Sequence, residues 1–175
     1  AQRQIVETDY LIAANLRQDK QFDAARAAFE QFLNAHPLDP RNPDIMFQIG
    51  DMLREQEAYQ DAIAQWKRAV SKYPQTDPAS QAQFEIGQLL ESKLLKFEEA
   101  FEAYKQVTWG SHYGAAQERM SAMQAKRLAV QTERVFRSNE TPALKVTTRN
   151  IETLTLKMYQ VDLETYFRKN QAVGG

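Results

Sequence analysis

Few side chains in this sequence could carry out chemistry. The chain has 175 residues, with no cysteine and two histidines, His36 and His112. Without cysteine there is no disulfide, thiolate metal site or cysteine nucleophile. The histidines occupy loops far apart in the sequence, so we do not expect them to form a metal site or a catalytic pair. Neighbouring carboxylates such as Glu98 and Glu99 are typical of a solvated helix surface. We therefore expect no catalytic residue, no metal and no cofactor, and hence no enzyme.

The charge and hydropathy of the chain argue against further classes of protein, namely those that bind nucleic acid and those that insert into membranes. The 22 basic and 23 acidic residues give a net charge of −1, so we expect no nucleic-acid partner. The apolar runs are far shorter than the roughly 20 residues that cross a bilayer, so we expect no direct membrane insertion. Residues 1–20 are amphipathic and polar, so we expect no signal peptide within the chain. A protein or peptide is the expected kind of partner.

The elements that must position any binding residue are repeated along the chain. The stretch 59–74 begins with Tyr59, carries Ala62 and Trp66 at helical spacing, and ends at Pro74. A similar stretch covers 22–37, and another begins at 97. An aromatic column at positions 10, 47 and 84 and an isoleucine column at 12, 49 and 86 recur every 37 residues. A period of this length predicts a helical solenoid with two helices in each repeat.

Apolar residues at helical spacing predict seven helices, separated by polar or proline-rich breaks. Three helix pairs form the repeats, and one further helix carries Tyr113, Ala116, Met120 and Met123 on its apolar side. We expect this last helix to cover the open end of the stack, because a solenoid needs a terminal helix with a polar outer face. The predicted ranges are 5–18, 22–35, 44–56, 59–72, 79–92, 97–108 and 111–128.

The repeats resemble the tetratricopeptide repeat over residues 3–112. The second repeat supplies the residues of that family's pattern: Met46, Ile49, Gly50, Leu53, Ala62, Trp66, Ala69 and Pro74. The first repeat departs from it with Ala13 in place of glycine, and the third has His112 in place of proline. The family repeat is about 34 residues, and the longer loops here resemble those of bacterial cell-envelope members. The mid-helix glycines, Gly50 and Gly87, indicate close helix approach, which we expect to be against the alanines of the second helices.

The segment after this array changes character and favours strands. Residues 132–138, 143–149 and 152–161 are expected strands, with a hairpin turn at Arg149 and Asn150. Residues 148–151 and 159–169 resemble the opening of an immunoglobulin-like macroglobulin domain, as in bacterial alpha-2-macroglobulin-like proteins. A complete sandwich of this kind needs about seven strands, so the resemblance implies a fragment of a longer protein. That family's thioester needs a cysteine, so no trapping chemistry is expected from this chain.

The aromatic column is also the candidate binding site. It lies on the first helix of each repeat, with charged and polar side chains beside it. Either these residues line a groove for a peptide or helix, or the aromatics serve packing between helices. The candidate residues are Tyr10, Arg17, Phe47, Asp51, Arg54, Phe84 and Gln88.

These patterns predict a mainly α protein: an antiparallel helix-hairpin solenoid of three tetratricopeptide-like repeats with a capping helix over 1–128, then a short β-hairpin segment over 129–175. The expected function is a non-catalytic interaction or scaffold module within a larger alpha-2-macroglobulin-like protein of the protease-inhibitor type. The alternative is a freestanding cell-envelope adaptor whose β tail pairs with a partner sheet or with itself. Both resemblances imply a periplasmic, cell-envelope or secreted location.

Overall fold

The computed structural model describes residues 2–132, 140–141, 143–157, 159, 162, 164 and 168. The chain divides into two compact units, Ala1–Gln124 and Ala125–Gly175, and each is described by itself. This division falls slightly before the domain boundary predicted at 128, which stays a prediction.

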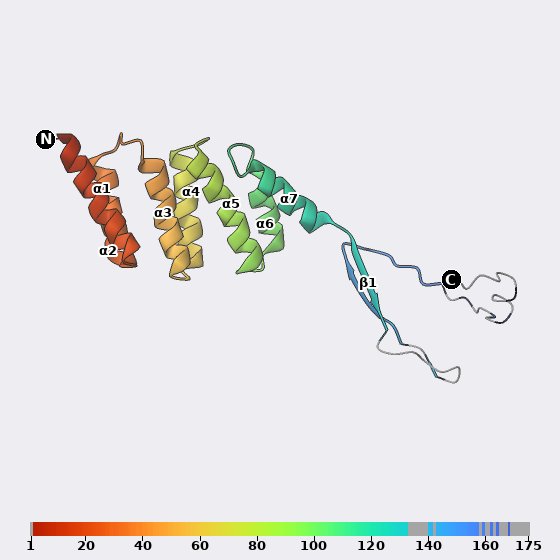
Figure 1. Cartoon of the computed structure of the whole chain (residues 1–175). Coiled ribbons are helices and arrows are strands. Elements are labelled where there is room, and N and C mark those ends of the chain that lie inside the picture. The colour runs from red at the N-terminus through yellow and green to blue at the C-terminus, as the bar shows by residue number, and fades with distance from the viewer. Residues whose placement is uncertain are drawn as a thin grey trace. The chain divides into compact units, whose positions relative to one another are not determined.

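The first unit is a row of helix pairs (Figure 1). In each repeat the first helix packs against the second, and neighbouring repeats stack through α2 with α3, α4 with α5, and α3 with α5. Helix α7 packs against α6. This arrangement confirms the predicted helix-hairpin solenoid with a terminal helix. The helices are α1 (Gln2–Gln18), α2 (Phe22–Ala35), α3 (Asn42–Glu55), α4 (Tyr59–Lys72), α5 (Asp77–Ser92), α6 (Phe97–Lys105) and α7 (Tyr113–Gln124).

Local sequence explains where these helices begin and turn. Pro43 and Pro78 lie in the first turns of α3 and α5, where a missing N–H costs nothing. The Thr76 side chain caps α5 by accepting a hydrogen bond from the Ala79 N–H at 3.3 Å. Within each repeat, the turn between the two helices contains a non-glycine residue of positive φ. These residues are Lys20, Glu57 and Leu95, with φ of 59°, 61° and 55°.

The core lies between the two helix layers and between repeats. Trp66 and Tyr104 are fully buried, as is Phe29 in the first repeat. The isoleucine column does not behave uniformly, because Ile49 is 3% exposed and Ile12 is 52% exposed. Ile12 lies on α1, and no helix precedes α1 in the described part of the chain (Figure 1). Recurrence of isoleucine at repeat spacing therefore does not bring equal burial at each position.

The second unit contains a two-stranded antiparallel sheet of β1 (Arg127–Gln131) and β2 (Lys145–Arg149). Strand β2 confirms the expected strand at 143–149. Its partner, however, is β1 and not the predicted strand at 152–161, whose described residues are not in a strand. The predicted helix at 111–128 was too long, because α7 ends at Gln124 and Leu128 lies in β1. Most of the expected strand at 132–138 lies outside the described residues.

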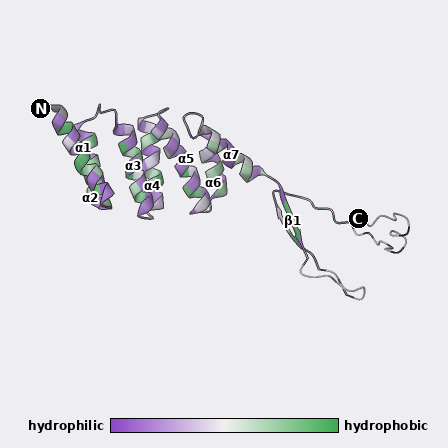
Figure 2. Cartoon of the chain, in the orientation of Figure 1, coloured by the Kyte–Doolittle hydropathy of each residue, from purple (hydrophilic) through white to green (hydrophobic). Residues whose placement is uncertain are grey.

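Hydropathy is mixed along every helix of the first unit. Figure 2 shows hydrophilic and hydrophobic residues side by side on α1 to α7, as expected for helices with one buried side. Among the described residues, no helix combines the length and apolar character needed to cross a membrane.

Candidate functional site

The aromatic column makes contacts inside its own repeats. Each member lies beside the large aromatic of the second helix of the same repeat, so the contacts favour packing over an open groove. Phe47 stacks on Trp66 with an interplanar angle of 16°, and the Trp66 Nε1–H donates to the Phe47 carbonyl at 3.1 Å. The ring-centroid distances are 6.2 Å for Tyr10–Phe29, 5.9 Å for Phe47–Trp66 and 5.5 Å for Phe84–Tyr104.

The charged candidates form one connected group on the first-helix face, the surface made by α1, α3, α5 and α7. Arg17 of α1 donates from Nη2 to Asp51 Oδ2 at 2.8 Å and from Nη1 to Gln48 at 3.2 Å. Arg54, one turn along α3, donates from Nε to Asp51 Oδ1 at 3.0 Å. Asp51 therefore links two repeats, and the sequence-predicted Arg17, Asp51 and Arg54 lie together.

The third repeat adds a carboxyl beside these charges, in the hollow that also includes Arg54. Glu85 of α5 interacts electrostatically with Arg54. Burial raises the pKa of the Glu85 carboxyl, and the nearby Asp51 adds to this, while Arg54 and His112 oppose it. Glu85 is a partly buried carboxyl among other charged groups, and its loss of hydration outweighs the attraction of Arg54 and His112. It is therefore a point at which protonation changes the charge of this face.

A third link joins α5 to α7. Arg119 pairs with Glu91, with its Nε donating to Oε2 at 3.2 Å, and the Tyr104 hydroxyl donates to the same oxygen at 2.9 Å. Burial and the Glu91 carboxylate raise the pKa of the Tyr104 hydroxyl. These three residues were missed by sequence reasoning. The sequence did contain one indication: the equivalent positions 17, 54 and 91, one in each repeat, are all charged.

Two small hollows flank these charges. One has a volume of about 330 Å³ and is lined by residues including Tyr10, Arg17 and Gln48. The other has a volume of about 280 Å³ and includes Arg54, Glu85 and Gln88. Of the candidate residues, the first hollow includes Tyr10 and Arg17 and the second includes Arg54 and Gln88. The structure therefore does not bring Tyr10 and Gln88 into one site. Neither hollow is lined by the remaining candidates, Phe47, Asp51 and Phe84.

The two histidines have separate partners. His36 Nε2 lies 2.9 Å from Asp9 Oδ2, and His112 Nδ1 lies 3.0 Å from the Ser111 hydroxyl. Among the described residues, no group of three or more histidine, aspartate or glutamate side chains is placed to hold a metal ion. What the described face offers is paired charge and hydrogen-bonding groups, which are suited to recognition of another polar surface.

A row of helix pairs with charge links between repeats defines a solenoid scaffold. The family model described as "Tetratricopeptide repeat" matches residues 10–76 and 47–116. These ranges cover more than half of the chain, which therefore belongs to the tetratricopeptide repeat family. Repeats of this family mediate protein–protein interactions and are generally non-catalytic scaffolds.

A solved structure agrees with this assignment of the fold. The chain is similar to a tetratricopeptide repeat protein from Parabacteroides merdae, with 17% identity and a TM-score of 0.50. The match covers 59% of this chain and 39% of that chain, so it spans well under half of the other protein. At this identity the similarity confirms the fold alone. No curated protein matches the sequence.

Proposed function

We propose that this chain is a scaffold region of a larger bacterial alpha-2-macroglobulin-like protein of the protease-inhibitor type. In this proposal the repeats hold or space protein partners, and the β segment begins an immunoglobulin-like domain. The observation that carries the proposal is the two-stranded sheet after the repeats, which has an exposed apolar face in the described part of the chain.

The β1–β2 ribbon has an uncovered apolar face. Its register places Val130 opposite Val146 and Leu128 opposite Thr148. Because side chains alternate along a strand, these residues share one face of the ribbon. Leu128 and Val130 are 51% and 53% exposed, and Val146 is only partly buried. A two-stranded ribbon is marginally stable alone, and an apolar sheet face is normally covered by a second layer. Further strands are the simplest way to supply that layer.

The sequence supports the nature of those strands. Residues 148–151 and 159–169 resemble the start of a macroglobulin domain, although most of 159–169 lies outside the described residues. The resemblance also supports a periplasmic, cell-envelope or secreted location. Because the chain has no cysteine, it can contribute to protease inhibition only by binding or spacing, and any thioester would lie elsewhere in the parent protein.

The length of the uninterrupted reading frame tests this proposal directly. A frame that continues after residue 175 into several further β domains supports it, and a frame that stops there refutes it. Hydrogen exchange supplies a physical readout. The amides of 127–131 should exchange rapidly in residues 1–175 and become protected in the protein encoded by the whole frame. Equal protection in both proteins would show that the ribbon needs no further strands.

A second candidate is a freestanding cell-envelope adaptor whose β tail adds to a partner sheet. It is favoured by the outer edges of β1 and β2, since each strand has only one neighbouring strand among the described residues. Unpaired edges readily accept another strand. If that strand comes from a second copy, residues 1–175 should dimerise in sedimentation experiments, and residues 1–124 should stay monomeric. Monomers in both cases would exclude pairing between copies.

A further inference from the structure

Two furrows lie on the opposite side of the first unit from the charge links, between successive second helices. The first furrow lies between α2 and α4 and has a volume of about 730 Å³. The second furrow lies between α4 and α6 and has a volume of about 410 Å³. Both fall within the usual size range of ligand sites. They were not among the features predicted from the sequence.

The furrows are equivalent positions of the repeat. The floor of the first is formed by Met46 and Ile49 of α3, and that of the second by Gln83 and Ile86 of α5. These pairs are 37 residues apart, the spacing of the repeat. The backbone frame is therefore shared, and any difference in what the furrows bind comes from their walls.

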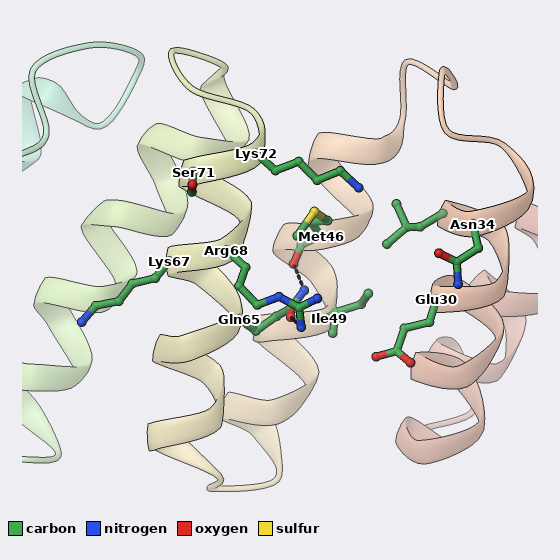
Figure 3. Close-up of a pocket in the computed structure, with 10 residues that line it drawn as sticks. Glu30, Asn34, Met46, Ile49, Gln65, Lys67, Arg68, Ser71 and Lys72 are labelled. Atoms are coloured by element: carbon green, nitrogen blue, oxygen red, sulfur yellow. Dashed lines mark hydrogen bonds between the residues drawn. The ribbon is translucent and has the colours of Figure 1, made fainter.

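The walls of the first furrow are mainly cationic. Arg68 and Lys72 of α4 line it, against the single carboxylate of Glu30 on α2, while the Lys67 side chain at its edge extends away toward the second furrow. Figure 3 shows Arg68 and Lys72 extending from α4 over the furrow, with Glu30 on the opposite wall. The second furrow has the reverse character, since Glu99 and Glu102 line it with Lys67.

Among the described residues, no ion pair joins Lys67, Arg68 or Lys72 to a carboxylate. Elsewhere, by contrast, Arg17, Arg54 and Arg119 are all in ion pairs. The contact that positions Arg68 is neutral. Its Nη1 donates at 3.3 Å to Oε1 of Gln65, a side chain that is 8% exposed. Gln65 is in turn fixed by donating from Nε2 to the Met46 carbonyl at 3.5 Å, the dashed line in Figure 3. Arg68 is thus held at the furrow with its charge uncompensated.

We propose that the first furrow binds an extended acidic segment of a partner protein that carries one apolar side chain. Carboxylates of the segment pair with Arg68 and Lys72, and its apolar side chain packs on Leu33 beside the Met46–Ile49 floor. Asn34 on one wall and Ser71 on the other supply hydrogen-bonding groups for the peptide backbone. A peptide fits better than nucleic acid, because the furrow has an apolar floor and an acidic side chain, which a phosphate backbone would not match.

The probe for this site is a fluorescently labelled peptide in which glutamates flank one leucine. Its binding to residues 1–175 is followed by fluorescence anisotropy, and NMR shifts of backbone amides locate the site. Arg68→Glu combined with Lys72→Glu should weaken binding roughly tenfold, because two favourable charge contacts become repulsive. Lys105→Glu is the control for a single charge reversal, since it reverses one charge on α6, at an exposed position that lines neither furrow. It should change affinity by less than about twofold.

Altered peptides and a second double variant test the same site independently. Replacing the peptide leucine with serine should weaken binding, and a lysine version of the peptide should not bind. If the double glutamate variant unfolds, Arg68→Gln with Lys72→Gln takes its place, with a smaller loss of affinity expected. The proposal is overturned if the acidic peptide does not bind, if it binds all variants equally, or if its shifts map to the first-helix face around Arg17, Asp51 and Arg54. Stronger binding of single-stranded DNA at the same amides would also overturn it. None of these outcomes depends on the proposed macroglobulin-like parent.

Discussion

The indole ring of Trp66 lies directly against the backbone of Gly50. A Cβ atom at Gly50 would be 2.3 Å from Trp66 Nε1, and one at Gly87 would be 2.5 Å from the Tyr104 ring. Sequence reasoning correctly identified these glycines as points of close helix approach, but the partner it named was the alanine of the second helix. The partner is instead the large aromatic of that helix, and this contact fixes the separation of the two helices within a repeat.

Gly50→Ala should therefore destabilise the protein, although alanine is the better helix former. We expect the free energy of unfolding to fall by about 1–3 kcal/mol, because the added methyl group overpacks a closed contact. Urea unfolding followed by circular dichroism measures this change. Gly114→Ala is the matched control, since a Cβ there has no atom within 4 Å. That variant should be unchanged or more stable by up to about 1 kcal/mol. Equal effects of the two substitutions would contradict the close contact.

Phe47→Ala tests whether the aromatic column serves packing or recognition. Because Phe47 stacks on the buried Trp66, we expect the free energy of unfolding to fall by about 2 kcal/mol or more. Gln88→Ala, at a partly exposed position on the same face, should leave stability unchanged. Melting temperature and partner capture are measured together. An unchanged melting temperature with loss of a specific partner would show that the column is a binding groove.

Glu85→Gln should change how stability depends on pH. Because burial raises the pKa of Glu85 above its ordinary 4.5, the folded protein holds this proton more tightly than the unfolded chain. The resulting stabilisation is present below the ordinary pKa and is lost as pH rises through the raised value. The variant lacks this loss, so its stability relative to wild type should increase from about pH 4 to pH 7. The urea unfolding midpoints of variant and wild type across that pH range measure this change, with Glu118→Gln at an exposed site as the control. A difference in stability between variant and wild type that stays constant with pH would refute the prediction.

Tyr104→Phe should loosen the junction between the third repeat and α7. The substitution removes the hydrogen bond to Glu91 and leaves the ring in place, which should cost about 1 kcal/mol. Relative to wild type, the substitution should speed up hydrogen exchange more in α7 than in α1. Such a difference would show that the effect is local. Tyr113→Phe serves as control, because Tyr113 is 47% exposed. Uniformly faster exchange along the chain would indicate general destabilisation and contradict a local junction.

The repeat period was sufficient to predict the solenoid, because each column of buried residues recurs with the same packing role. The period could not predict that Ile12 is exposed, since burial at that position depends on a preceding helix and not on the residue itself. Strand pairing failed for a similar reason. Threonine and valine content indicated that 143–149 is extended, but the alternation that indicated a partner strand lay in 152–161. The partner β1 lies instead in a stretch whose charges and alanines also suited a helix.

The candidate site was predicted in part. Arg17 and Arg54 are 37 residues apart, and Asp51 precedes Arg54 by about one helical turn, so their proximity follows from the stacking of α1 on α3. The furrow at Arg68 was missed, because its character depends on which carboxylates are absent from the facing wall. A pattern along one helix does not contain that information, and only the packing of α2 beside α4 supplies it.

The charge at position 91 also determines how the repeats can be ordered. The first two repeats present arginine in this column, Arg17 and Arg54, and the third presents Glu91. Glu91 accepts an arginine from the helix that follows. If the second repeat were duplicated and inserted after the third, the copy of Asp51 would face Glu91, carboxylate against carboxylate. The three repeats share a backbone frame, yet they are not interchangeable, and an array rebuilt in another order would lose a link at each mismatched junction.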